Sequence, residues 1–266
     1  MKTRKFDCVD YEEDGPIAII RMNNNERRNS LNLSMRRGLN GAFGQFEEND
    51  NIRVAILTGV GNSFCSGQDT KDMVGLSEEE RQRQAEERRK LNRWGAFEHR
   101  DRIPKPVIAA VNGWAIGYGW FVAMGCDLVV AAESAIFWQN EPLFGYQGGG
   151  QAIATQMLPF HLGVEIALAA KMTPQRCYEI GLINKVTPDD QLILTAREMA
   201  QNICELAPLS VRIIVEACRS ARLSNVVPSS VALARWQEFN YLPNTQDVRE
   251  GFKAFVEKRK PEWKGR

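Results

Sequence analysis

Histidine is scarce in this 266-residue sequence, which contains only His99 and His161. A metal site rich in histidine, or a proton relay built on several histidines, is therefore not expected. The six cysteines are dispersed along the chain and form no CxxC pair. Free thiols in a reducing compartment fit this distribution best, so we expect neither a bound metal nor another cofactor.

Long apolar runs and a strong net charge are also missing. No stretch approaches the roughly 20 apolar residues that cross a bilayer, and residues 1–15 turn acidic where a signal peptide would be apolar. The 34 lysine and arginine residues nearly balance 33 aspartate and glutamate residues, which leaves a net charge of +1. Such a chain has no global field to attract nucleic acid or membranes. We expect a soluble cytoplasmic protein with neither partner.

What the sequence does contain is enough apolar material for a large core. Hydrophobic residues make up 44% of the chain, an ordinary value for one main globular domain with an appendage. Apolar runs and their bounding turns predict strands over 17–22, 54–59, 107–111 and 128–132, and helices over 32–46, 77–90 and 119–125. Strands alternating with helices indicate a parallel sheet. From about residue 188, amphipathic helices are expected, with breaks at Pro208, Pro228 and Pro243.

Two glycine-containing segments carry the strongest functional signal. Residues 64–73 read FCSGQDTKDM, and residues 105–119 read KPVIAAVNGWAIGYG, followed by Cys126 and Asp127. Both segments resemble the signatures of the crotonase (enoyl-CoA hydratase/isomerase) superfamily, although Thr70 replaces the usual aliphatic residue. Three further segments are similar to family landmarks in the same order, at 29–32, 180–186 and 251–259. The resemblance covers nearly the whole chain.

The resemblance implies an architecture and an assembly. The α/β fold would be the crotonase (ClpP-like) spiral core of repeated ββα units, with the CoA and acyl site, over residues 1–190. Residues 191–266 would form a C-terminal helical trimerisation region. The expected assembly is a homotrimer or a hexamer made of two trimers.

The family's chemistry explains the two glycine-flanked turns. Removing a proton next to a thioester, or adding a nucleophile at the β-carbon, drives negative charge onto the thioester oxygen, which needs preorganised donors. By resemblance, the donors are the backbone N–H groups of Gln68 and Tyr118, and the second lies near a helix N-terminus. Tyr118 departs from the glycine usual at its position, so its ring must occupy a specific place.

Only one of the family's two acid/base glutamates is expected here. Counted from Asp127, the first position falls on Phe121, which transfers no proton, and the second falls on Glu141. Aromatic and apolar neighbours in the sequence favour a raised pKa for Glu141, suited to proton shuttling. The alternative interpretation is a surface glutamate in a loop. Double-bond migration needs a single base, whereas hydration is simplest with two, although one group can serve both steps.

The reaction class therefore stays open. The leading hypothesis is an enzyme of fatty acid metabolism: either a lyase that hydrates an enoyl-CoA or an isomerase that moves its double bond. A second is a lyase, hydrolase or synthase acting on carbon–carbon bonds of a bulky or cyclic acyl-CoA. A third is a non-catalytic CoA-binding relative, which the loss of acid/base capacity at Phe121 would suit.

Binding residues follow from composition and from resemblance. Aromatic residues crowd the presumed acyl side, where core packing explains most of them and a bulky acyl pocket is the alternative: Trp94, Trp114, Trp120, Phe121, Trp138, Phe144 and Tyr146. The resemblance assigns CoA contacts to Arg28, Ser30, Leu31, Thr70, Lys71, Phe255 and Lys258, the last two across a subunit interface.

Overall fold

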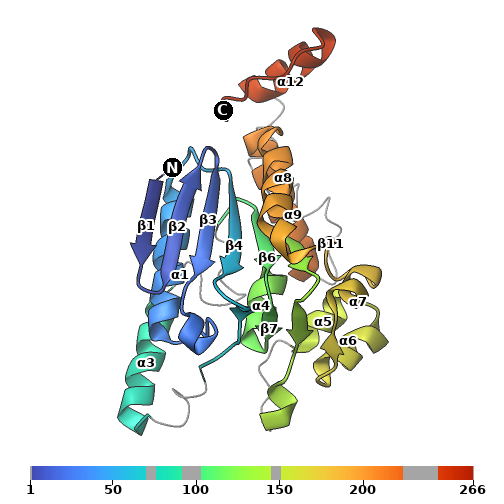
Figure 1. Ribbon diagram of the computed structural model, residues 1–266. Coiled ribbons are helices and arrows are strands. Elements are labelled where there is room, and N and C mark those ends of the chain that lie inside the picture. The colour runs from blue at the N-terminus through green and yellow to red at the C-terminus, as the bar shows by residue number, and fades with distance from the viewer. Residues whose placement is uncertain (1, 70–75, 92–102, 145–150, 224–244, 266) are drawn as a thin grey trace.

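The computed structural model describes residues 2–69, 76–91, 103–144, 151–223 and 245–265. These residues form two β-sheets with helices around them, and the N- and C-termini lie on the same side of the molecule (Figure 1). The architecture is of the α/β class, as the alternation of strands and helices in the sequence predicted.

The larger sheet has seven strands in the order β1-β2-β3-β4-β6-β8-β11. The β1–β2 and β2–β3 pairs are antiparallel, and the pairs from β3 to β11 are parallel. The strands are β1 (Lys2–Phe6), β2 (Val9–Asp14), β3 (Ile17–Met22), β4 (Val54–Gly59), β6 (Val107–Val111), β8 (Leu128–Ala132) and β11 (Lys185–Thr187). The four strands predicted from apolar runs all form with the expected bounds.

The central strands are buried on both faces, which is why they read as continuous apolar runs. On one face, Ile56, Ile108 and Val130 pack against Leu192 and Ala196 of α8 (Leu192–Cys204). On the other face, the alternate residues join a larger cluster that also contains α1 and α4. Since α8 completes one side of the core, the first helix of the C-terminal region is part of the packed sheet layer.

The smaller sheet repeats one pattern three times. Each of β4, β6 and β8 is followed, after a short turn, by a strand of three residues: β5 (Ser63–Cys65), β7 (Trp114–Ile116) and β9 (Ile136–Trp138). These short strands are parallel neighbours in the order β9-β7-β5, and β10 (Lys171–Met172) pairs antiparallel with β9. Because the three short strands are parallel neighbours, the segments that follow them lie at the same edge of this sheet.

Helices begin where the sequence places capping residues. In α1 (Leu33–Glu48), the side chain of Asn32 accepts from the Met35 amide. In α3 (Glu78–Lys90), the Ser77 hydroxyl accepts from the Glu80 amide and the Glu80 carboxylate accepts from the Ser77 amide, which is a capping box.

The other helical elements are η1 (Asn25–Arg27), α4 (Tyr118–Gly125), η3 (Glu141–Phe144), α5 (Gln151–Met157), α6 (Phe160–Ala167), α7 (Pro174–Glu179), η4 (Asp189–Gln191), α9 (Pro208–Leu223) and α12 (Gln246–Val256). The predicted break at Pro208 is the start of α9, whereas Pro228 and Pro243 lie outside the described residues. Among the helices described, none has the length and apolar character to cross a membrane.

Candidate active site

The candidate site lies where β5, β7 and β9 end. Because parallel neighbours end at the same edge of a sheet, the residues that follow each strand lie side by side. The segment after β5 contains Gly67 and Gln68, the segment after β7 contains Gly117 and Tyr118, and the segment after β9 reaches Glu141. The Gly117 amide donates to the Trp138 carbonyl at 2.8 Å, which ties the second and third segments together.

The first turn, which contains Gly67 and Gln68, is in direct contact with the second turn, which contains Gly117 and Tyr118. Gly67 has a φ of 87°, and a Cβ atom there would lie 2.6 Å from the Ile116 carbonyl oxygen and 3.1 Å from the Tyr118 amide nitrogen. Both the conformation and the close approach require glycine. The Gly67 carbonyl also accepts from the Leu31 amide at 2.8 Å, which fixes the first turn from the other side. The geometry therefore brings the Gln68 and Tyr118 segments together, as an oxyanion hole needs.

Glu141 lies against the second turn. Gly117 has a φ of 53°, and a Cβ atom there would be 3.3 Å from the Glu141 Oε1 atom and 3.1 Å from the Asn140 Oδ1 atom. The carboxyl group of Glu141 is thus next to the backbone that leads into Tyr118. Glycine at 117 leaves the space that the carboxyl group uses.

The carboxyl group of Glu141 is buried and only partly hydrogen-bonded. The residue is only 9% exposed, and its Oε2 atom is buried without a hydrogen-bond partner among the described residues. Burial raises the pKa of Glu141, and a backbone hydrogen bond opposes this shift. The surface-loop interpretation of Glu141 is therefore wrong, because the side chain faces the interior.

Asp69 is the other carboxylate close to the turns, and its hydrogen-bonding capacity is engaged. The Arg27 Nη1 atom donates to Asp69 Oδ2 at 2.9 Å, and the Ser30 hydroxyl donates to the same oxygen at 2.7 Å. Asp69 is buried, and these two donors hold its carboxylate in place. It anchors the segment 27–30 to the first turn.

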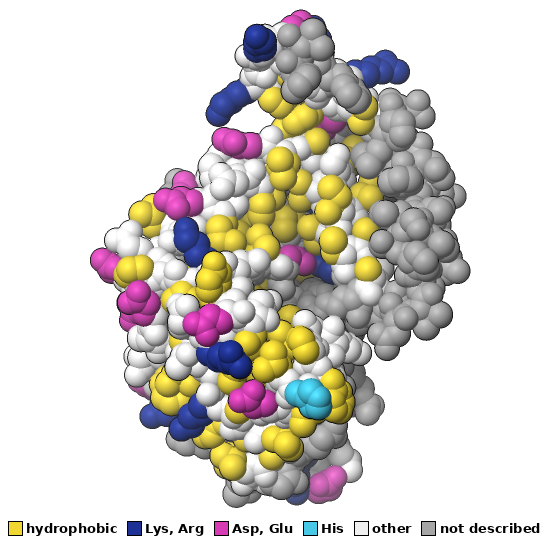
Figure 2. Space-filling model, turned by 90° about the vertical axis from the view of Figure 1, so that its right-hand side faces the viewer, with side chains coloured by type: hydrophobic (Ala, Val, Ile, Leu, Met, Phe, Trp, Pro, Cys, Tyr) yellow, Lys and Arg dark blue, Asp and Glu magenta, His cyan; other side chains and the backbone are white. Residues whose placement is uncertain are grey.

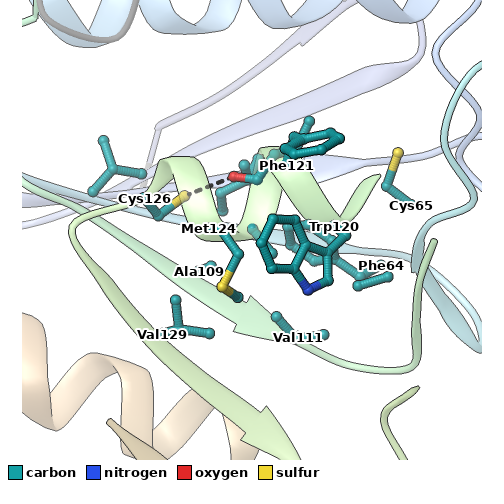
Figure 3. Packing of buried hydrophobic residues seen from close by; sticks show 14 of the residues in the cluster. Phe64, Cys65, Ala109, Val111, Trp120, Phe121, Met124, Cys126 and Val129 are labelled. Atoms are coloured by element: carbon teal, nitrogen blue, oxygen red, sulfur yellow. Dashed lines mark hydrogen bonds between the residues drawn. The ribbon is translucent and has the colours of Figure 1, made fainter. Parts of the chain in front are cut away.

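Two predicted pocket aromatics on α4 have different surroundings. Trp120 is fully buried in the hydrophobic core on the side of α4 that faces Ala109 and Val111 (Figure 3). Phe121, at the position of the missing glutamate, is also buried, and its ring packs edge-on against Tyr118 with centroids 5.9 Å apart. Trp120 therefore serves the core, whereas Phe121 adjoins the second turn.

The other predicted pocket residues differ in their surroundings. Trp114 is half-buried on β7, and Trp138 donates from its indole to the Ala169 carbonyl at 2.9 Å while Lys171 lies over its ring. Phe144 is 70% exposed at the end of η3. Trp94 and Tyr146 lie outside the described residues.

Part of the predicted CoA set lies beside the first turn. Ser30 and Leu31 contact Asp69 and Gly67 as described above, and the carbonyl of Arg28 accepts from the Ser66 amide at 3.0 Å. The Arg28 side chain is exposed next to them. Lys258 is exposed just beyond α12. Thr70, Lys71 and the side chain of Phe255 lie outside the described residues.

Sequence reasoning missed two buried polar side chains near these turns. Arg36 of α1 donates from Nη2 to the Gln68 Oε1 atom at 2.9 Å. Gln139 is fully buried between β9 and Glu141, and neither of its side-chain polar atoms has a hydrogen-bond partner within the described structure. A charged residue in the first turn of a helix and an amide after a strand look like surface positions in a sequence. No group of three or more potential metal ligands occurs among the described residues.

Comparisons with known proteins identify the family of the chain. A family model described as enoyl-CoA hydratase/isomerase matches residues 12–266. The short-chain-enoyl-CoA hydratase of Clostridium acetobutylicum is 32% identical over 263 residues, which cover 96% of each chain. The mevalonyl-coenzyme A hydratase of Aspergillus fumigatus is 33% identical over 256 residues, which cover 93% of this chain and 91% of that protein.

Solved structures match over the same length. The crystal structure of an enoyl-CoA hydratase from Bacillus anthracis has a TM-score of 0.85 and 30% identity, and it covers 97% of this chain and 100% of its own. The family model thus spans almost all of the sequence, and the fold agrees from end to end. The chain belongs to the enoyl-CoA hydratase/isomerase family.

Proposed function

We propose that the chain is an acyl-CoA enzyme that isomerises or hydrates a carbon–carbon double bond near the thioester. The thioester oxygen is held between the Gln68 and Tyr118 amides, and Glu141 transfers the protons. The observation that carries this proposal is the position of Glu141, whose buried carboxyl group lies beside Gly117, one residue before Tyr118.

One carboxylate can perform the whole isomerisation. Glu141 takes a proton from the α-carbon of a 3-enoyl-CoA, the electron pair moves onto the thioester oxygen as an enolate, and the two amides stabilise the charge. The same carboxyl group then returns the proton at the γ-carbon, which gives the 2-enoyl-CoA. Hydration by the same group takes a proton from water as it adds to the β-carbon and returns it to the α-carbon.

Phe121 supports this single-carboxylate mechanism. It is buried and packed between Trp120 and Tyr118, so the place of the expected first glutamate is apolar. An apolar wall there cannot hold a second catalytic carboxylate, and it keeps bulk water away from the enolate. We therefore expect isomerisation to be favoured over hydration. Chemistry on carbon–carbon bonds and a purely scaffolding role are the competing outcomes.

Substitution of Glu141 tests the proposal. Turnover is measured over a panel of 2-enoyl-, 3-enoyl- and cyclic acyl-CoAs, and the best substrate is compared between the wild type and Glu141→Gln. The variant keeps the size of the side chain but cannot accept the proton, so turnover should fall by at least about 100-fold. Affinity for the acyl-CoA should change little. The matched control is Glu133→Gln, an exposed position after β8.

The outcomes separate the alternatives. Turnover at the wild-type rate in Glu141→Gln would remove Glu141 from the mechanism. Tight CoA-ester binding without turnover on the whole panel would instead identify the chain as a scaffold. Cleavage of a cyclic or branched acyl-CoA would favour the carbon–carbon chemistry.

We also infer that the working unit is a homotrimer or a dimer of trimers, in which Phe255 and Lys258 reach a neighbouring subunit's CoA. Large exposed apolar residues on α8 and α9 support this inference, among them Leu194 and Ile214. The cytoplasmic location expected from the sequence stays a prediction, and two relatives, from Dictyostelium discoideum and Pongo abelii, are described as mitochondrial.

A further inference from the structure

Arg36 contacts both residues that supply the candidate oxyanion amides. It lies in the first turn of α1, and its Nη2 atom donates to the Gln68 side chain at 2.9 Å. Its guanidinium carbon lies 5.1 Å from the centroid of the Tyr118 ring, in cation–π contact. One side chain therefore touches the first turn by a hydrogen bond and the second by stacking.

A shift of the Arg36 side chain would displace the two backbone segments that carry the candidate oxyanion amides. The two turns already meet where the Gly67 Cα approaches the Tyr118 amide nitrogen, so the backbone there has little space to adjust. The Tyr118 ring is fixed on one edge by Phe121, and Arg36 lies over its face. Because Gln68 and Tyr118 are proposed to donate through their backbone amides, contacts of their side chains can orient those amides without competing with the donation.

Arg36 also places a permanent positive charge next to the two turns. A guanidinium stays protonated in proteins, and this one is only 8% exposed, so solvent screens it weakly. The charge acts on the interior of the first turn: burial raises the pKa of the Cys65 thiol to about 12, and the positive charge of Arg36 opposes that rise. Cys65 directly precedes the Ser66–Gly67 turn, so the same charge acts where an enolate oxygen would form.

We propose that Arg36 is a positioning residue for the oxyanion hole. Arg36 fixes the positions of the Gln68 and Tyr118 side chains relative to each other, and its charge favours negative charge on the thioester oxygen. This inference rests on the proposed function. It predicts that Arg36 affects the polarisation of the bound thioester carbonyl and the rate of chemistry, and that it has little effect on ground-state affinity.

The experiment compares Arg36→Met, which keeps the length of the side chain and removes the charge, with Arg36→Lys, which keeps the charge and loses the planar donor. The control is Arg37→Met, whose side chain is half exposed and pairs with Glu87 of α3. The probe is butanoyl-CoA labelled with ¹³C at the carbonyl. This thioester has no carbon–carbon double bond, so it can be neither isomerised nor hydrated. Its carbonyl stretching frequency falls on binding if the hole polarises it.

In Arg36→Met we expect the frequency of the bound carbonyl to move back towards that of free butanoyl-CoA, with Kd nearly unchanged. With the best substrate of the panel, kcat should fall by roughly 10- to 100-fold, less than for deletion of an oxyanion donor. Arg36→Lys should retain much of the carbonyl shift and lie between Arg36→Met and the wild type in kcat. Arg37→Met should match the wild type.

The inference is overturned if Arg36→Met keeps both the wild-type carbonyl frequency and the wild-type kcat, or if it weakens binding alone. Glu141→Gln distinguishes this failure from failure of the proposed function, because it should lose turnover and retain the carbonyl shift. No shift in the wild type would refute the oxyanion hole itself. Should Arg36→Met not fold, Gln68→Met breaks the same hydrogen bond, and an unshifted carbonyl frequency in that variant would also overturn the inference.

Discussion

Glu141 combines burial with an incompletely satisfied carboxylate, which is costly for stability and useful for catalysis. A buried carboxylate oxygen without a hydrogen-bond partner lowers stability unless the group takes up a proton. Proton uptake at moderate pH is also what an acid/base residue needs. Glu141 is therefore a residue at which folding and function should be in conflict.

This conflict predicts that Glu141→Gln is more stable than the wild type at neutral pH. Because burial raises the pKa of Glu141 in the folded chain, the folded state binds the proton more tightly than the unfolded state does. The stability that Glu141 contributes is therefore fully present below its unfolded pKa and is lost as pH rises through its folded pKa. A neutral glutamine avoids that loss. We expect a gain of about 1 kcal/mol, which raises Tm by about 2–4 °C.

Thermal unfolding at a series of pH values between about 5 and 8 measures this difference. The gain in Tm of Glu141→Gln over the wild type should grow with pH across the series. Glu133→Gln, at an exposed position, should show no such trend. A gain that is independent of pH, or a loss of stability at the upper end, would mean that the carboxylate of Glu141 is not destabilised by its surroundings.

At the scale of elements, one buried ion pair attaches α9 to the sheet. The guanidinium of Arg219 donates from Nε and Nη2 to the two carboxylate oxygens of Asp127 at 2.7 and 2.6 Å. Arg219 also donates to the carbonyls of Ile103 and Lys105, and Asp127 accepts from the Val107 amide. Asp127 belongs to the segment between α4 and β8, and Val107 begins β6, so this network links α9 to two central strands of the larger sheet.

Truncation of Arg219 should therefore be far more costly than truncation of a surface arginine. Arg219→Ala leaves Asp127 largely buried without its ionic partner, and we expect a loss of about 3–5 kcal/mol in the free energy of unfolding. The control is Arg212→Ala on the same helix, whose partner Asp50 is highly exposed, and it should cost no more than about 1 kcal/mol. Urea unfolding at fixed protein concentration measures both. Equal effects would contradict a special role for Arg219.

The sequence predicts the elements that depend on local pattern and misses those that depend on pairing. The strands β3, β4, β6 and β8 are buried on both faces, so their apolar runs are distinctive. The β1–β2 hairpin has an exposed, highly charged first strand that resembles an irregular N-terminus. The strands β5, β7 and β9 have three residues each, and only their pairing with one another makes them strands.

The site residues also fall into those that the sequence predicts and those that it misses. Glycine at 67 and 117 and the carboxylate at 141 are found from the sequence, because close approach and proton transfer require those residue types. Arg36 could not be found, since its burial comes from contacts with residues 32 and 82 positions away. Trp120 was expected in the acyl pocket because of its residue type, but its side of α4 packs into the core.

At the scale of the whole molecule, the repeat of two strands and a turn explains why the site is composite. Each repeat contributes one short segment, and none of the three contains both proposed donors and the proposed base. The parallel order β9-β7-β5 aligns the segments, so the Gln68, Tyr118 and Glu141 positions lie at neighbouring strand ends without any long connection. Groups on adjacent strand ends are held more rigidly than groups on a single long loop.

The described part of the molecule also has large apolar side chains exposed on α8 and α9. Figure 2 shows hydrophobic side chains gathered over the part of the molecule where Figure 1 places α8 and α9. Leu194 on α8, Leu206 before α9 and Ile214 on α9 are each more than half exposed. Contiguous exposed apolar surface of this kind is typical of subunit interfaces. A closed assembly of identical chains would cover it in each subunit at once.

We therefore expect light scattering at micromolar concentration to give a mass three or six times that of the 30.0 kDa chain. Ile214→Asp places a charge among the exposed apolar side chains of α8 and α9, where assembly would have to bury it unpaired, so the variant should dissociate towards monomers. Its far-ultraviolet circular dichroism should be retained, because Ile214 is 59% exposed and supports little of the core. The control is Leu168→Asp beyond α6, a residue that is 72% exposed and lies outside α8 and α9, which should keep the wild-type mass. A monomeric wild type would refute the assembly, whereas dissociation by Leu168→Asp alone would move the interface from α8 and α9 to α6.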